Sequence, residues 1–136
     1  MGITTRDLIA DYYTAFNAGD TEDMIAMVSD DIRHDVNQGE RRVGKAAFIE
    51  FNAHMTRCYK EQLTDIVIMI DEEEPSRASA EFIVNGQYIA TDDGLPEAKG
   101  QTYRLPAGTF FELDKGKITR ITTYYNLQDW IAQVAG

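Results

Sequence analysis

Residues 4–28, TTRDLIADYYTAFNAGDTEDMIAMV, carry two helix signals in succession and decide the first half of the fold. Either of the two leading threonines can cap a helix, because a threonine hydroxyl accepts a hydrogen bond from a free amide of the first turn. Leu8, Tyr12 and Phe16 then recur every four residues, which predicts an apolar stripe along one helix. This amphipathic helix must pack its stripe against another element.

A glycine-aspartate pair separates this helix from a shorter second one. Gly19 suits the left-handed position that ends many helices, and Asp20 can cap the next helix. Met24 and Val28 are expected on the inner face of that helix, which the run SDDI at 29–32 closes. The chain is therefore predicted to form two packed helices before its first strand.

Apolar spacing predicts the remaining elements. A third helix is expected over 45–59, with one face formed by Phe48, Phe51, Met55, Cys58 and Tyr59. Strands are predicted over 32–37, 63–71, 77–90, 102–113 and 117–126, and NLQDWIAQV at 126–134 predicts a closing helix capped by Asn126. The segment 92–101 is expected to be a loop that covers a pocket mouth or simply connects two strands.

Helices gathered before a run of antiparallel strands are typical of an α+β fold. Three helices can cover only one face of such a sheet. We therefore expect one domain over 1–136, a cone-shaped curved antiparallel sheet wrapped around three N-terminal helices. The apolar interior of such a cone is a natural pocket for a small molecule.

The charge and composition of the chain limit the classes of molecule that it is expected to bind. The net charge is −10, and phosphate backbones and anionic membranes both require clustered basic residues, so neither nucleic acid nor a membrane is expected as a partner. Cys58 is the only cysteine, which excludes an intrachain disulfide and favours a reducing, cytoplasmic setting. The start of the sequence lacks the basic and long apolar regions of a signal peptide.

Motifs for common cofactor chemistry are absent from the sequence. It contains no P-loop, no dinucleotide-binding fingerprint, no HExxH and no nucleophile elbow. The two histidines and one cysteine would need carboxylates to complete a zinc site. We therefore expect neither a cofactor nor a metal.

Three stretches resemble the ketosteroid isomerase-related and SnoaL-like branch of the nuclear transport factor 2-like superfamily. They are YYTAFNAGDTEDMIAMVSDDIRHD at 12–35, DVNQGERRVGKAAFIEF at 35–51 and DKGKITRITTYYNLQDW at 114–130. Together they span nearly the whole chain. The resemblance implies a cone-shaped α+β barrel, a small-ligand pocket and a symmetric dimer.

The resemblance also implies residue roles. Asp35 lies nine residues before Gly44, the interval of the isomerase general base, and Tyr12 matches the tyrosine that binds the substrate oxygen. Two departures stand out: the segment from Asp31 to Asp35 is one residue shorter, and Thr109 replaces an acid that acts as the second oxyanion donor. From the residues alone, Asp35 is either a buried base or a charged strand end.

The rest of the pocket follows from strand alternation and helix faces. Alternation from Thr109 places 103, 105, 107 and 111 on one side of their strand, although Pro106 interrupts the pattern. The pocket residues expected beside Tyr12 and Asp35 are Phe16, Asn37, Phe51, Met55, Tyr103, Thr109, Phe111 and Tyr125.

Other residues are expected to have structural roles. His34 should point away from the pocket, since it neighbours Asp35, and His54 lies at the margin of the third helix's apolar face. The outer sheet face carries Ile83, Phe110 and Tyr124, and an apolar sheet face usually contacts a partner. A homodimer through that face is the expectation.

The leading hypothesis is a cofactor-independent isomerase or cyclase that acts on a small apolar or carbonyl-containing molecule. Asp35 would move a proton next to a carbonyl, and Tyr12 would stabilise the enolate oxygen. The alternatives are a non-catalytic ligand-binding protein and a protein-interaction module that uses the sheet face. A third alternative, water activation as in limonene epoxide hydrolase relatives, needs an Asp–Arg–Asp cluster, for which Arg104 is the arginine to check.

Overall fold

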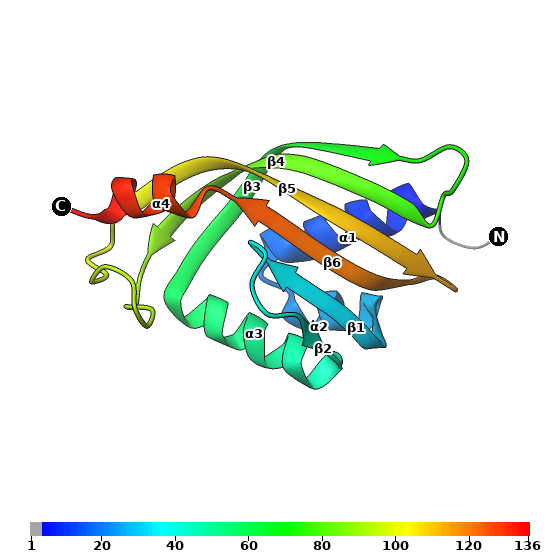
Figure 1. The fold of residues 1–136 in the computed structure, drawn as a ribbon, viewed down its shortest axis with the longest axis horizontal. Coiled ribbons are helices and arrows are strands. Elements are labelled where there is room, and N and C mark those ends of the chain that lie inside the picture. The colour runs from blue at the N-terminus through cyan, green and yellow to red at the C-terminus, as the bar shows by residue number, and fades with distance from the viewer. Residues whose placement is uncertain (1–3) are drawn as a thin grey trace.

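The computed structural model describes residues 4–136 and confirms an α+β fold (Figure 1). The helices are α1 (Thr5–Ala18), α2 (Thr21–Met27), α3 (Lys45–Cys58) and α4 (Leu127–Val134). The strands are β1 (Val28–Val36), β2 (Arg42–Val43), β3 (Tyr59–Ile70), β4 (Arg77–Tyr88), β5 (Thr102–Asp114) and β6 (Lys117–Tyr125). Within this described part of the chain, no helix has the length and apolar character needed to cross a bilayer.

The strands form one six-stranded curved sheet in the order β2-β1-β6-β5-β4-β3. Strands β3 to β6 pair in antiparallel fashion with their sequence neighbours, whereas β1 runs parallel to β6. The prediction of a wholly antiparallel sheet is therefore wrong at this pair. It is a long-range pairing between the two ends of the fold, and short-range alternation carries no information about it.

The helix caps agree with the sequence predictions. The Thr4 side chain accepts a hydrogen bond from the Asp7 amide, and Gly19 takes the left-handed conformation at φ 71°. Asp20 and Asn126 cap α2 and α4 by accepting hydrogen bonds from amides in the first turn. Each cap satisfies an amide that the helix itself leaves unpaired.

The boundaries around β1 and β3 differ from those predicted. Residues 28–31 belong to β1, because Val28 is fully buried and pairs with Ile118 of β6. A β-branched side chain favours this extended, packed position over the end of a helix. Strand β3 begins at Tyr59, directly after α3, and adds residues 59–62 to the sheet.

Curvature and helix packing create the concave face of the sheet. Irregularities interrupt the pairing of β3 between Thr64 and Val67, and of β5 between Glu112 and Leu113. Such bulges bend a sheet and increase its twist. Helix α1 packs against β3 and α4 against β5, so the two helices flank opposite parts of the curved sheet (Figure 1).

Candidate functional site

A cavity of about 720 Å³ lies between the concave face of the sheet and the helices. Its lining is mostly apolar and aromatic, which suits a small hydrophobic ligand. Tyr12 and seven of the eight predicted pocket residues line it, namely Phe16, Asn37, Phe51, Met55, Tyr103, Thr109 and Tyr125. Alternation along β5 thus holds through Pro106, since Leu105 and Ala107 also line the cavity.

Phe111 is a core residue and does not line the cavity. Its side chain is fully buried, and its ring packs edge-on against Tyr12 and Tyr13, with centroids 6.5 and 6.1 Å apart. It lies on the predicted side of β5, but the tyrosines of α1 cover it. The prediction that Phe111 lines the pocket therefore differs from the structure, in which it belongs to the core.

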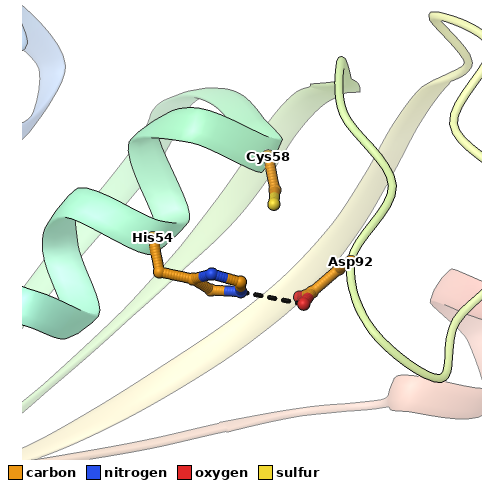
Figure 2. Close-up of side chains that lie close together, drawn as sticks. All are labelled: His54, Cys58 and Asp92. Atoms are coloured by element: carbon orange, nitrogen blue, oxygen red, sulfur yellow. Dashed lines mark hydrogen bonds and ion pairs between the residues drawn. The ribbon is translucent and has the colours of Figure 1, made fainter.

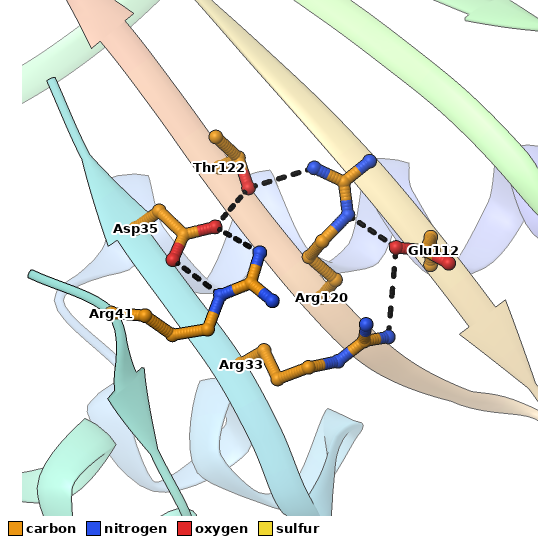
Figure 3. A network of polar contacts seen from close by, with 6 residues as sticks. All are labelled: Arg33, Asp35, Arg41, Glu112, Arg120 and Thr122. Carbon is orange, nitrogen blue, oxygen red and sulfur yellow. Dashed lines mark hydrogen bonds and ion pairs between the residues drawn. The ribbon is translucent and has the colours of Figure 1, made fainter. Parts of the chain in front are cut away.

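The expected base, Asp35, lies outside the cavity, and its predicted position is wrong. Its two carboxylate oxygens accept hydrogen bonds from Arg41 Nε and Nη2 at 2.8 and 2.9 Å, and the Thr122 hydroxyl donates a third at 2.6 Å (Figure 3). Arg120, Glu112 and Arg33 extend this network along the same face of the sheet. Both oxygens of the Asp35 carboxylate are thus occupied by hydrogen bonds from Arg41 and Thr122.

His34 occupies the inward position instead. Neighbouring strand residues point to opposite faces, so the strand sends one of His34 and Asp35 into the cavity and the other outward. The imidazole lines the cavity, and its ring meets those of Phe48 and Phe51 edge-on at 5.5 and 4.5 Å. Burial and the nearby Arg42 lower the pKa of His34 to about 4, so the imidazole is neutral near pH 7.

A carboxylate of β3, Glu61, faces the cavity in place of Asp35. Its partner is Tyr103 of β5, whose hydroxyl donates to Glu61 Oε2 at 2.5 Å. Gly86 of β4 pairs with Glu61 on one side and Tyr103 on the other, and the Tyr103 ring lies across it. The glycine leaves room for the tyrosine to reach over one strand to the carboxylate.

The protein environment of Glu61 favours the protonated carboxylic acid over the carboxylate, compared with a glutamate in water. Burial raises the pKa of Glu61 above its ordinary value, although the Tyr103 hydrogen bond acts in the opposite direction. Burial also raises the pKa of nearby Tyr125, and the Glu61 and Asp92 carboxylates raise it further. The backbone of Tyr125 is held by Asn37: the Tyr125 amide donates a hydrogen bond to Asn37 Oδ1 at 2.8 Å.

A second polar group at the cavity joins α3 to the 92–101 loop. Asp92 Oδ1 and His54 Nε2 lie 2.8 Å apart, and Tyr59 donates to Asp92 Oδ2 at 2.6 Å. Arg57 Nη2 lies 3.0 Å from His54 Nδ1. Since an arginine can only donate, His54 Nδ1 accepts this bond and Nε2–H donates to Asp92. The loop thus contributes Asp92, together with Leu95, to the cavity lining.

His54, Cys58 and Asp92 are also the residues described here that could hold a metal. One donor atom of each lies within 4.8 Å of the others, and Figure 2 shows the three side chains converging. Both Asp92 oxygens and both His54 nitrogens already take part in hydrogen bonds within the protein. Hydrogen bonds within the protein therefore already hold the His54 and Asp92 side chains in place.

Comparison with known families shows which family the chain belongs to. A model of the SnoaL-like domain matches residues 9–121. The chain belongs to the SnoaL-like domain family. Comparison with curated proteins finds no match.

Solved structures of similar chains are available from several bacteria. A candidate polyketide cyclase from Pseudomonas putida KT2440 is 57% identical, with a TM-score of 0.96 over 98% of this chain and 100% of that one. A second candidate polyketide cyclase, from Silicibacter sp. TM1040, is 58% identical, with a TM-score of 0.94 over 98% and 96% of the two chains. A nuclear transport factor 2-like protein from Burkholderia xenovorans LB400 shares the fold at 14% identity, with a TM-score of 0.76 over 98% and 99%.

The outer face of the sheet in this SnoaL-like protein carries several exposed apolar side chains. Phe110 and Tyr124 are 48% and 41% exposed, and their rings meet edge-on at 5.9 Å. Val67 and Met69 of β3 are exposed to a similar degree. The homodimer expected through this face stays a prediction.

Replacing Asp35 with asparagine is expected to lower the free energy of unfolding by about 1–2 kcal/mol, because the charged hydrogen bonds to Arg41 are lost. Urea unfolding measures the change. Arg41 holds the pKa of Asp35 at about 2 instead of 3.8, so the contribution is present above pH 3.8 and disappears as the pH falls through 2. The matched control is Asp31→Asn on the exposed part of β1, which should change stability by less than about 0.5 kcal/mol. Equal effects of the two substitutions would contradict the structural role.

Proposed function

We propose that this SnoaL-like protein catalyses cofactor-independent proton transfer next to a carbonyl of a small apolar molecule, in an aldol-type cyclisation or an isomerisation. The observation that carries the proposal is the Glu61 carboxylate in the cavity, hydrogen-bonded to Tyr103 and raised in pKa by burial. The 57% and 58% identity to candidate polyketide cyclases supports the cyclase class.

Glu61 suits the role of general base. A base works best when its pKa approaches the working pH, and burial shifts a carboxylic acid in that direction. Tyr103 orients the carboxylate by occupying Oε2, which leaves Oε1 for the ligand. Asp92 is the less suitable carboxylate: burial favours a higher pKa, but hydrogen bonds from Tyr59 and His54 lower it below its ordinary value.

Tyrosine hydroxyls supply donors for the developing oxyanion. Tyr125 lines the cavity close to Glu61, and Tyr12 lines it from α1. Preorganised donors in a low-dielectric site lower the free energy of an enolate more than water does. In this proposal Tyr12 has the oxyanion-donor role that the family resemblance implies, and Glu61 is the base in place of Asp35.

The proposed step balances without a cofactor. Glu61 takes a proton from the carbon next to a ligand carbonyl, and the C–H electron pair forms the enolate. In a cyclisation, the enolate carbon attacks a second carbonyl of the same molecule, and the alkoxide takes the proton back from Glu61. In an isomerisation, the proton returns to a different carbon.

Deuterium exchange of 1-tetralone, an aryl ketone with exchangeable protons next to its carbonyl, tests the proposal. The wild-type protein is expected to accelerate exchange in D₂O by at least about 100-fold over buffer, as read by proton NMR. Serum albumin at equal concentration controls for unspecific carboxylates. Saturable binding of 1-tetralone with no acceleration would favour the non-catalytic ligand-binding alternative.

A further inference from the structure

The end of the cavity near β1 and β2 differs in charge from the Glu61 end. Arg42 of β2 lines it, and its guanidinium carbon lies 4.7 Å from the centroid of the Phe51 ring. Within residues 4–136, Arg42 forms no ion pair with a carboxylate. The neighbouring Arg41, in contrast, is engaged by Asp35. Stacking on Phe51 thus holds an uncompensated cation at the cavity wall.

His34 adds an unpartnered polar group at the same place. His34 is 6% exposed, and its Nδ1 is buried with no hydrogen-bond partner in the described chain. An unpaired buried N–H costs more than an unpaired lone pair, so the neutral ring carries its proton on Nε2. The Nε2–H then remains as a donor toward the cavity that His34 lines.

We propose that the Arg42 guanidinium and the His34 imidazole form a subsite for a carboxylate on the ligand. The subsite offers one charged and one neutral donor and lies beside the aromatic rings of Phe48 and Phe51, an arrangement that suits a planar anion on an apolar body. This inference rests on the proposed function only for the orientation of the ligand in the cavity. With its carboxylate at Arg42, the ligand places its apolar, carbonyl-containing part next to Glu61. The substrate class is therefore an apolar carboxylic acid with an internal carbonyl.

Neither of the nearby acidic side chains, Asp35 and Glu40, forms an ion pair with Arg42. Asp35 lies on the other face of the sheet and is bound to Arg41 and Thr122. Glu40 also lines the cavity mouth and, like Arg42, is exposed to water, but no ion pair joins these two side chains within residues 4–136.

Calorimetric titration with 2-naphthoate and 2-acetylnaphthalene tests the subsite. The two probes have similar size, and only the first carries a carboxylate. The wild-type protein is expected to bind 2-naphthoate about tenfold more tightly, since hydrogen bonds to a charged group are worth about that factor. Arg42→Gln should abolish the preference, Arg42→Lys should keep most of it, and His34→Phe should reduce it.

The matched control is Arg104→Gln on β5, outside the cavity lining, which should leave the preference unchanged. Equal affinity of the wild type for the two probes, no binding of 2-naphthoate, or a preference that survives Arg42→Gln would each overturn the subsite. The probes require no turnover. Failure of the subsite is therefore distinguishable from failure of catalysis, which 1-tetralone exchange measures separately.

Discussion

Glu61→Gln is expected to slow 1-tetralone exchange by about 100- to 10,000-fold, the range of rate that a general base contributes. The substitution keeps the shape of the side chain, and the amide oxygen can still accept the hydrogen bond from Tyr103. What it removes is the group that accepts the proton. Exchange rates of the purified variant and wild type at equal protein concentration measure the loss.

The stability of the same variant separates chemistry from folding. Because burial raises the pKa of Glu61 in the folded state, its ionisation reduces stability as the pH rises from its ordinary pKa through the raised value. At pH 7 Glu61→Gln should therefore raise the free energy of unfolding, by about 1 kcal/mol. A variant that loses exchange while gaining stability has lost the base. If the exchange rate and the free energy of unfolding of Glu61→Gln both decreased, a structural role for Glu61 would explain both effects.

Gly86→Val is expected to destabilise the protein by about 1–3 kcal/mol, the usual effect of forcing extra atoms into a packed site. A Cβ atom at Gly86 would lie 2.2 Å from Tyr103 Cζ and 2.5 Å from its hydroxyl oxygen. The ring would have to leave Glu61, so exchange should fall as well. Valine itself favours strands, so the backbone is not the cause. Urea unfolding and 1-tetralone exchange measure the two effects.

A double substitution tests this cause. Tyr103→Ala removes the ring that a side chain at position 86 would meet, so Gly86→Val should cost little in that background. The two substitutions are therefore expected to be non-additive, with an interaction energy of about 1–3 kcal/mol. Additive effects would show that valine at position 86 disturbs something other than Tyr103.

The sequence predicted most of the fold because its local signals are consistent. The spacing of apolar side chains in α1 and α3, and the caps at Thr4, Gly19 and Asp20, correspond to contacts within a few residues. The parallel pairing of β1 with β6 joins residues about ninety positions apart, and no short-range pattern encodes it.

The candidate site was predicted in outline, and its carboxylate was misplaced. Alternation correctly separates His34 from Asp35, but it does not say which of the two faces the interior. The shortened segment from Asp31 to Asp35 was the available signal, because a shift of one residue along a strand exchanges its two faces.

Glu61 was missed because the predicted third helix ended at 59 and the next strand began at 63. In the structure β3 starts at Tyr59, so 59, 61 and 63 alternate onto the cavity face. Extending the strand back to the helix end would have revealed Glu61. Its partner Tyr103 reaches it only across Gly86, a contact that depends on the order of three strands.

The pKa of Glu61 is the most direct test of the central claim that the cavity holds a desolvated carboxylate able to act as a base. Carbon-13 NMR titration of the side-chain carboxyl measures it in the ligand-free protein, with the spectrum of Glu61→Gln providing the assignment. The predicted result is a pKa above the ordinary 4.5. A pKa at or below 4.5 would mean that water or a nearby cation stabilises the charged carboxylate. It would contradict the claim that the carboxylate is desolvated.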